Sequence, residues 1–141
     1  MSQLFIFTDG GARGNPGPAA CAFIAKDSQN QIVNISSKVL GIATNNIAEY
    51  QGVIEALNWL VGLLAKKEPI PDSIIFFLDS QLVVNQLQGN FKTKEIHLKN
   101  LLAQVKFLEQ KLKMNISYHH IPRAENHLAD FHLNRALDAS L

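Results

Sequence analysis

The sequence contains little cysteine, tryptophan or net charge, and it has no long hydrophobic run. Its 141 residues include one cysteine and one tryptophan, and the formal net charge is +1. A single cysteine cannot form an internal disulfide, which excludes the disulfide-rich secreted proteins and favours a reducing compartment, the cytoplasm. No apolar stretch is long enough to span a bilayer and the first residues do not resemble a signal peptide, so we expect no membrane association.

The rest of the composition is typical of one globular domain. Apolar residues make up 47% of the chain, which is enough for a core at this length. No internal repeat, low-complexity segment or long linker interrupts the sequence, so we predict a single domain over residues 1–141. No strong exposed apolar stripe requires a partner, and we expect a monomer with no obligate protein partner.

Hydrophobic periodicity predicts a mixture of strands and helices. We expect strands near 3–9, 18–27, 31–40, 73–78 and 115–121, and helices near 45–66, 80–88, 94–112 and 126–138. Turn residues between the first three strands predict an antiparallel meander, whereas the later strands follow helices and should add in parallel. The pattern predicts an α/β fold.

Four carboxylates lie where apolar elements begin or end. Asp9 and Asp79 each close an apolar run typical of a buried strand, and ligands bind at the carboxyl ends of such strands in open α/β sheets. Glu49 and Asp130 each begin an otherwise apolar row of a predicted helix. Four buried carboxylates repel one another unless cations share the site. The pattern therefore predicts a cation site.

Two of these carboxylates, and the nearby Asn126, also have a purely structural interpretation. Asp79 could cap the helix that follows it, and Asn126 could cap the last helix. Glu49 could complete a capping box that begins at Asn46. The coincidence of four carboxylates at the ends of apolar elements favours a functional site over separate structural roles.

The donor set favours a hard cation. Carboxylate oxygens suit Mg²⁺ or Mn²⁺, whereas one cysteine and five scattered histidines give no zinc-binding spacing. Two ions about 3.5–4 Å apart, as in phosphoryl-transfer enzymes, would use the clustered carboxylates together, so phosphodiester hydrolysis is the leading chemistry. We expect His97, His119 and His132 at or near the surface without a catalytic role, and Cys21 as an inert core thiol.

Four segments match one family in order, each with its carboxylate. They are residues 7–18 (FTDGGARGNPGP), 44–49 (TNNIAE), 79–86 (DSQLVVNQ) and 121–130 (IPRAENHLAD). They resemble ribonuclease HI, the type 1 ribonuclease H family, which cuts the RNA strand of RNA–DNA hybrids. The resemblance implies a ribonuclease H-like fold, with a five-stranded mixed sheet of an antiparallel meander and parallel strands flanked by helices. It also implies an endoribonuclease whose products carry 5′-phosphate and 3′-hydroxyl ends.

The resemblance assigns a metal role to each carboxylate. Asp9 would bridge two Mg²⁺ ions, and Asp130 would help hold the ion that activates the attacking water. Glu49 and Asp79 would hold the ion that stabilises the leaving 3′ oxygen. Mn²⁺ would be a substitute cofactor.

The resemblance also implies how an RNA–DNA hybrid is bound. The implied substrate contacts are Gly10, Gly11, Asn15, Thr44, Asn45, Asn46, Gln81, Asn85 and Arg123. Several of the amide side chains match positions that contact sugars and base edges in the minor groove, and Thr44 matches a position that binds a DNA phosphate. Amides both donate and accept, so they can sense a 2′ hydroxyl without demanding one base sequence.

The segment between the second and third predicted helices departs from the better-studied bacterial pattern. Those proteins carry a basic, tryptophan-rich protrusion there, whereas only residues 89–94 separate the two helices here. We therefore expect weaker and more salt-sensitive hybrid binding, with Lys92, Lys94 and Lys99 as candidates for a smaller basic patch. The short linker and the Ile-Pro-Arg loop at residues 121–123 resemble the compact variant of the family, which is common in archaea and some bacteria.

The loop before Asp130 also departs from that pattern, because it lacks the mobile histidine that many members place there. Arg123 or His127 could take its place. We favour Arg123, which could hold a substrate phosphate, because His127 lies inside the start of the helix and is less free to move.

Two other functions remain open at this point. A hybrid-binding module on the same fold that has lost catalysis is the first alternative, although a complete set of costly carboxylates argues against it. A different nuclease or a transposase-like enzyme is the second, and the short length and residues 44–46 argue against that. The fold alone does not decide between them.

Overall fold

Strands and helices follow one another as the periodicity predicts. The structure is a computed structural model and describes residues 2–140. The strands are β1 (Gln3–Ala12), β2 (Gly17–Asp27), β3 (Ile32–Ala43), β4 (Ser73–Leu78) and β5 (Asn115–His120). The helices are α1 (Asn45–Ala65), α2 (Gln81–Leu87), α3 (Ile96–Leu112) and α4 (His127–Ser140), and the short 3₁₀ helix η1 (Arg123–Asn126) precedes α4. β1 and β3 extend beyond their predicted ends because both pair with β2 up to the turns.

The five strands form one mixed sheet in the order β3-β2-β1-β4-β5. β1 pairs with β2 and β2 with β3 in antiparallel fashion, which confirms the predicted meander. β4 joins β1 in parallel, and β5 joins β4 in parallel. The carboxyl ends of β1 and β4 therefore lie side by side at one edge of the sheet.

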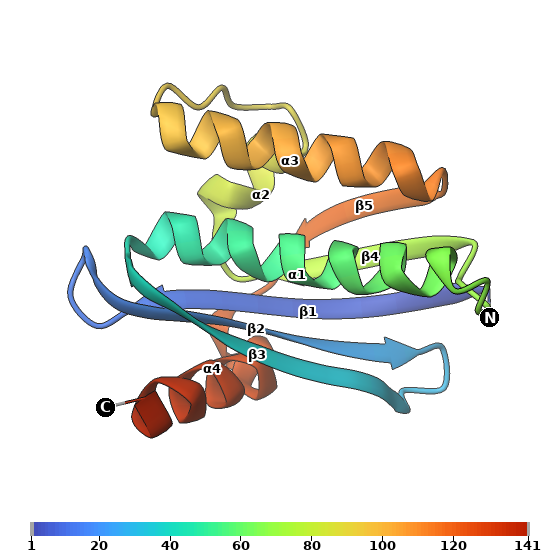
Figure 1. Ribbon diagram of the computed structural model, residues 1–141, viewed down its shortest axis with the longest axis horizontal. Helices are drawn as coiled ribbons and strands as arrows, with labels where there is room; N and C mark the ends of the chain where they lie inside the picture. Colours follow the sequence, from blue (N-terminus) through green and yellow to red (C-terminus); the bar gives the residue numbers. More distant parts are fainter. Residues whose placement is uncertain (1, 141) are drawn as a thin grey trace.

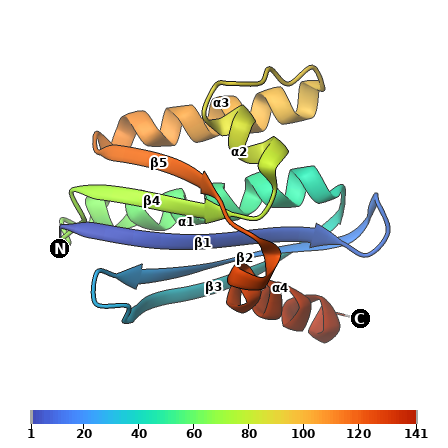
Figure 2. The same cartoon turned by 180° about the vertical axis from the view of Figure 1, so that it is seen from behind.

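Helices cover the two faces of the sheet unequally. α1 packs against β1 and β2 and α3 packs against α1, whereas α4 lies on the opposite face over β2, β3 and β1 (Figures 1 and 2). The row of α1 that Glu49 begins, Val53, Ala56 and Leu60, is buried as predicted. In the neighbouring apolar row of α1, Tyr50, Ile54 and Leu57 are buried, whereas Leu64 near the end of the helix is 40% exposed.

The starts of the helices exclude the structural interpretations of two carboxylates. Thr44 caps α1 by accepting a hydrogen bond from the backbone N–H of Ile47, so the capping box from Asn46 to Glu49 is wrong. Ser80 caps α2 in the same way, so Asp79 is not the cap.

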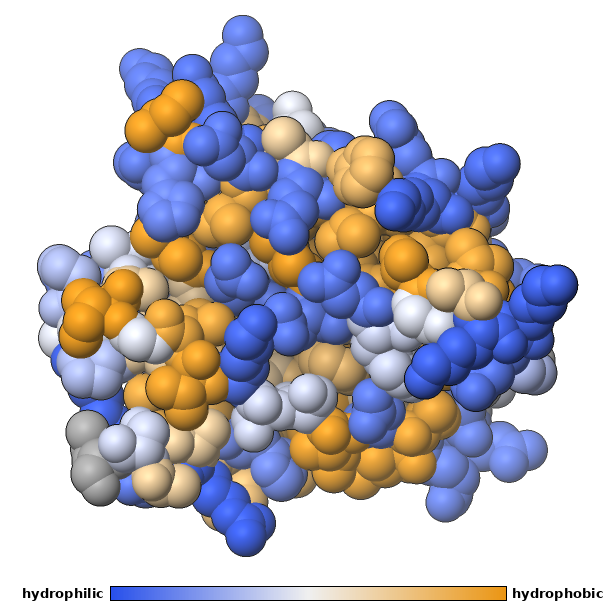
Figure 3. All heavy atoms as spheres, in the orientation of Figure 1, coloured by the Kyte–Doolittle hydropathy of each residue, from blue (hydrophilic) through white to orange (hydrophobic). Residues whose placement is uncertain are grey.

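The surface mixes polar and apolar side chains. On the face drawn in Figure 3, hydrophilic residues are interspersed with apolar ones. None of the helices within residues 2–140 has the length and apolar character that crossing a bilayer requires.

Candidate active site

Three carboxylates from three elements meet at the carboxyl ends of β1 and β4. Asp9 lies in β1, Glu49 in α1, and Asp79 directly follows β4. One oxygen atom of each lies within 4.8 Å of the corresponding atoms of the other two. Asp9 and Glu49 are only 6% and 7% exposed, and Asp79 is half-buried. The sequence pattern thus predicted correctly that these side chains converge.

A glycine allows α1 to approach β1 this closely. A Cβ atom on Gly10 would overlap backbone atoms of Ala48 and Glu49. A larger residue would push β1 and α1 apart, and Asp9 and Glu49 with them. The missing side chain of Gly10 therefore serves the contact between strand and helix.

Asp130 lines the same pocket but lies outside the three-carboxylate cluster. It projects from α4, and its Oδ1 accepts a hydrogen bond of 3.1 Å from Nδ2 of Asn134. The pocket has a volume of about 410 Å³ and is lined by Asp9, Gly10, Gly11, Ala12, Asn45, Asn46, Glu49, Asp79, Ser80, Arg123, Asp130 and Leu133. All four predicted carboxylates therefore face one cavity.

Burial and mutual repulsion make this site costly to ionise. Burial, followed by the charges of Asp79 and Asp130, raises the pKa of Asp9 from 3.8 to about 7. Burial, followed by the charges of Asp9 and Asp79, raises the pKa of Glu49 well above its ordinary value. Oε2 of Glu49 is also buried without a hydrogen-bond partner. A divalent cation would coordinate such an oxygen and offset the repulsion, so the residues fit a metal site.

Asn126 is a site residue whose role the sequence did not reveal. It is 1% exposed, and its Nδ2 donates to the backbone oxygen of Thr8 at 2.8 Å and to Oδ2 of Asp79 at 3.1 Å. Its Oδ1 has no hydrogen-bond partner, so the predicted capping role is wrong. The available signal was its spacing of one helical turn before Asp130.

Two of the predicted substrate-binding amides have fixed orientations. Oδ1 of Asn45 accepts from the backbone N–H of Ala12 at 2.8 Å, and Oδ1 of Asn15 accepts from the backbone N–H of Asn45 at 2.9 Å. Each amide therefore offers its Nδ2 group to a ligand. This refines the expectation that these side chains both donate and accept.

Four predicted contacts lie outside the lining of the acidic pocket. Asn15 is exposed in the turn between β1 and β2, and Thr44 uses its hydroxyl oxygen to cap α1, which leaves its O–H free to donate. Gln81 and Asn85 lie on α2, which begins directly beyond Asp79 and Ser80. These residues flank the pocket on two sides.

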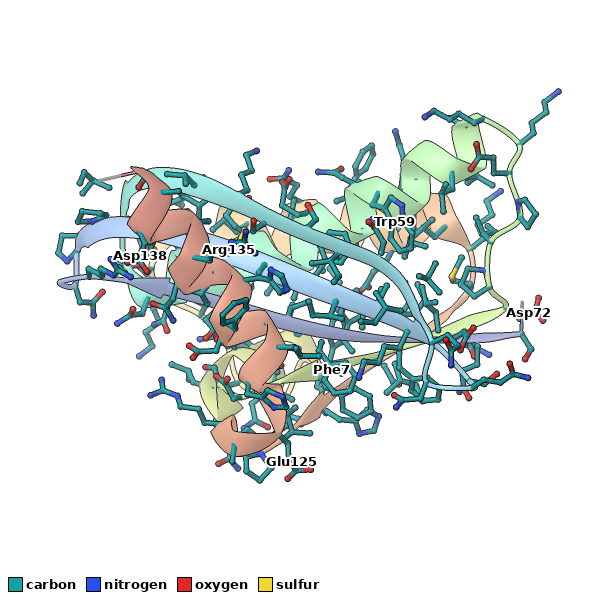
Figure 4. All side chains as sticks on the ribbon, turned by 90° about the horizontal axis from the view of Figure 1, so that it is seen from below. Phe7, Trp59, Asp72, Glu125, Arg135 and Asp138 are labelled. Carbon is teal, nitrogen blue, oxygen red and sulfur yellow. The ribbon has the colours of Figure 1, made fainter. Side chains whose placement is uncertain are left out.

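Arg123, and not His127, lines the acidic pocket. Arg123 is exposed in η1, and its charge lowers the pKa of Glu49 against the larger effects that raise it. His127 lines a separate small cavity together with Phe7 and Glu125. Figure 4 shows Glu125 just before the start of α4. This placement agrees with the preference for Arg123.

The remaining candidate residues lie where the sequence predicted. His97 and His119 are exposed, His132 is half-buried, and none of the three lines the acidic pocket. Cys21 is buried in β2, and burial raises the pKa of its thiol to about 12, which agrees with an inert side chain.

A basic groove lies beyond α2, and we call it the α3 groove. It is lined by Gln86, Gly89, Phe91, Lys92, Thr93, Lys94, Lys99, Leu102, Ala103 and Lys106. Phe91 is 52% exposed, whereas Nζ of Lys106 bonds the backbone oxygen of Leu87. Residues 88–95 connect α2 to α3 without an intervening helix, so the basic protrusion is missing as predicted.

The sequence of this chain is similar to a known family and to several known proteins over almost its whole length. A model of the family described as reverse transcriptase-like matches residues 7–136. A protein of Halobacterium salinarum named ribonuclease HI is 37% identical over 136 residues, which is 96% of this chain and 65% of that protein. The bifunctional protein Rv2228c of Mycobacterium tuberculosis is 38% identical over 139 residues, 98% of this chain but 36% of its own length. The chain therefore spans less than two thirds of these curated relatives.

Solved structures extend the likeness to the fold. The crystal structure of LC11-RNase H1 in complex with an RNA/DNA hybrid superposes with a TM-score of 0.90 at 36% identity, covering 97% of this chain and 98% of that one. RNase H1 from Halobacterium salinarum superposes with a TM-score of 0.86 at 35% identity, covering 98% and 99% of the two chains. Because these structures share more than a third of their residues with the chain over almost its whole length, the protein belongs to the ribonuclease H1 family.

Proposed function

We propose that this protein is an endoribonuclease that hydrolyses the RNA strand of RNA–DNA hybrids and leaves 5′-phosphate and 3′-hydroxyl ends. The observation that carries the proposal is the convergence of Asp9, Glu49 and Asp79, with Asp130, in one pocket of a ribonuclease H1 family member. LC11-RNase H1, which shares the fold, was crystallised with an RNA/DNA hybrid.

The four carboxylates would hold two divalent ions, Mg²⁺ in the first place and Mn²⁺ as a substitute. The ions, when bound, would supply an activated water and charge stabilisation for the leaving oxygen. Asp9, whose pKa is raised by the charges of both Asp79 and Asp130, would help to hold both ions. The side-chain amide of Asn126 would orient Asp79 through its hydrogen bond to Oδ2.

Substrate selection would come from groups around this pocket. The Nδ2 groups of Asn15 and Asn45 would donate to minor-groove acceptors, which every base pair presents, so we expect little sequence preference. Asn46, Gln81 and Asn85 would contact sugars and base edges, including the 2′ hydroxyl. The free O–H of Thr44 would donate to a phosphate of the DNA strand.

Arg123 would take a substrate phosphate beside the carboxylates. Its guanidinium is permanently charged and suits bidentate phosphate binding, and it lines the pocket from η1. Gly10 and Gly11 also line the pocket, where their backbone would contact the RNA strand.

The proposal also covers the molecule as a whole. One continuous sheet runs through the described residues, which supports a single catalytic domain over residues 1–141. We infer that the domain acts as a monomer on the hybrid without an obligate protein partner. A single buried thiol supports a cytoplasmic location.

The test is cleavage of an end-labelled RNA–DNA hybrid with Mg²⁺, Mn²⁺ or EDTA, beside single-stranded RNA and double-stranded RNA. We expect metal-dependent cutting of the RNA strand of the hybrid, and a loss of at least about a thousandfold in an Asp9→Asn variant. Intact hybrid binding without cutting under either metal would instead identify a binding module that has lost catalysis.

A further inference from the structure

Asp130 is the one metal-binding candidate that the central cluster does not hold in place. Asp9, Glu49 and Asp79 converge from the sheet edge and α1, whereas Asp130 reaches the pocket from α4 on the other face. A carboxylate on a helix surface can rotate about its side-chain bonds, so its orientation depends on its hydrogen-bond partners. The partners of Asp130 therefore decide how it meets a cation.

We propose that Asn134 is a positioning residue for Asp130, and that Arg13 fixes the amide of Asn134 in the orientation that this role requires. The inference deepens the proposed function and rests on Asp130 being a metal ligand. It assigns a role to two residues, one in the turn between β1 and β2 and one in α4.

The geometry along α4 carries the first step. Asp130, Asn134 and Asp138 follow one another at intervals of four residues and therefore lie on one face of the helix. Nδ2 of Asn134 donates to Oδ1 of Asp130 at 3.1 Å and to its backbone oxygen at 2.9 Å. This leaves Oδ2 of Asp130 as the oxygen available to a cation.

The second step is the orientation of the Asn134 amide. The Nη2 atom of Arg13 donates to Oδ1 and to the backbone oxygen of Asn134, both at 3.4 Å. A guanidinium can only donate, so it must face the amide oxygen, and the amide nitrogen is thereby turned toward Asp130. Reversing the amide would place two donors together and leave Asp130 facing an oxygen.

Asp138 completes the chain by holding Arg13. Its Oδ1 lies 2.7 Å from Nη2 of Arg13, and Figure 4 shows Asp138 near the end of α4 that lies beside the β1–β2 turn. Both side chains are substantially exposed, at 38% and 69%, so this ion pair contributes little to stability. The ion pair instead holds the guanidinium of Arg13 in contact with Asn134.

A role in positioning and a role in mere tethering of α4 predict different results. A tether affects the melting temperature and leaves metal binding unchanged in the folded protein. A positioning residue changes the affinity for metal while the fold remains stable. Substitution of a group that orients a metal ligand commonly lowers metal affinity about 10–100-fold.

The experiment compares Asn134→Ala, Arg13→Ala and Arg13→Lys with the unchanged protein. Alanine is a better helix former than asparagine, so α4 should form in the first variant. Arg135→Ala is the matched control, since Arg135 is an exposed cation of the same helix (Figure 4). The readouts are Mn²⁺ binding by titration calorimetry without substrate, the melting temperature, and hybrid cleavage over a range of Mg²⁺ concentrations.

We expect Asn134→Ala to weaken Mn²⁺ binding, and to raise the Mg²⁺ concentration for half-maximal cleavage, by about tenfold. Arg13→Ala should act in the same direction but less strongly, and Arg13→Lys should restore part of the loss. Arg135→Ala should bind Mn²⁺ like the unchanged protein. Unchanged Mn²⁺ binding and metal dependence in a folded Asn134→Ala protein would overturn the proposal.

The readouts also separate this inference from the proposed function. If the unchanged protein binds Mn²⁺ but does not cut hybrids, the proposed function fails, and the binding titration still tests the role of Asn134. If hybrids are cut with the same metal dependence in all variants, the proposed function holds and the positioning role is wrong.

Discussion

At the residue scale, the side chain of Asn126 joins a strand to a metal-binding candidate. Its amide nitrogen satisfies the backbone oxygen of buried Thr8 and also holds Asp79. In the sequence the same residue is only a good helix cap, because an isolated asparagine before an apolar row gives no sign of a partner more than a hundred residues away. Only the packing of η1 against β1 in the structure shows that Asn126 contacts Thr8 and Asp79.

Replacement of Asn126 by alanine should therefore damage both stability and catalysis. The buried oxygen of Thr8 would lose its donor, which costs about 1–3 kcal/mol of unfolding free energy. Asp79 would lose an orienting hydrogen bond, so cleavage should fall by roughly ten- to a hundredfold. Urea denaturation and hybrid cleavage measure the two effects. Asn58→Ala, at an exposed position of α1, is the control, and equal effects of both variants would contradict this role.

The raised pKa of Asp9 predicts an unusual dependence of stability on pH in metal-free protein. The folded state keeps the Asp9 proton up to about pH 7, whereas the unfolded state releases it near 3.8. Between these values the folded state binds more protons, so the free energy of unfolding should fall as pH rises, by up to about 4 kcal/mol. Stability is greatest below the lower value and is lost as pH passes the higher one.

Urea denaturation in EDTA from pH 4 to pH 8 measures this effect. Asp9→Asn cannot ionise at this position, so its stability should vary less over the same range. Added Mg²⁺ should restore stability at pH 8 in the unchanged protein, because a bound cation favours the ionised carboxylates. Stability that rises with pH in EDTA would contradict the prediction.

At the scale of elements, the contact between β1 and α1 determines whether the cluster forms. The two elements touch through the backbone at Gly10, where no side chain fits. β1 and β4 bring two carboxylates to the sheet edge by parallel pairing, and α1 adds the third only because of this close approach.

Gly10→Ala should therefore separate β1 from α1 and weaken metal binding. We expect a loss of unfolding free energy on the order of 2–4 kcal/mol, since a backbone clash in a packed interior has no flexible neighbour to absorb it. Gly62→Ala is a matched control in α1, because nothing lies within 4 Å of the added Cβ there. That variant should be stabilised by about 0.5–1 kcal/mol. Thermal unfolding and Mn²⁺ titration compare the pair, and a Gly10→Ala protein as stable as the control would contradict the argument.

At the scale of the whole molecule, the placement of charge matters more than its sum. A net charge of +1 is small for a protein that binds a polyanion. The α3 groove nevertheless gathers Lys92, Lys94 and Lys99 around exposed Phe91, at the end of the molecule where α1 begins and β1 ends (Figure 1). We therefore expect these three lysines to contribute more to hybrid affinity than three exposed lysines elsewhere on the surface.

The triple substitution of Lys92, Lys94 and Lys99 by alanine tests this point. We expect hybrid affinity at low salt to fall by roughly ten- to a hundredfold, and the slope of log affinity against log salt to become shallower by up to about 3. Lys66, Lys67 and Lys113, exposed at the far ends of α1 and α3, provide the matched triple control. Fluorescence anisotropy in EDTA, at two or more salt concentrations, measures binding without cleavage. Equal losses in both triple variants would show that the groove has no special role.

Much of this architecture follows from local patterns. The apolar run before Asp9 predicts a strand that ends near this carboxylate, and the apolar row that Glu49 begins predicts a helix and the side that Glu49 faces. Resemblance to the ribonuclease H family at four motifs then supplied the five-stranded mixed sheet and the set of site residues, whereas the order of the strands came from the structure. None of these inferences required knowledge of contacts between distant parts of the chain.

The sequence by itself determined the elements, the family and the identity of the four carboxylates, because these depend on residue type and spacing. Only the tertiary structure decided that Asn126 holds Asp79, that the oxygens of Asn15 and Asn45 already have backbone partners, and that Arg13 faces Asn134. Hydrogen bonds between distant segments depend on distances of a few tenths of an ångström and on the direction of each amide. No periodicity in a sequence encodes such distances, and the packing of α4 and η1 against the sheet sets them.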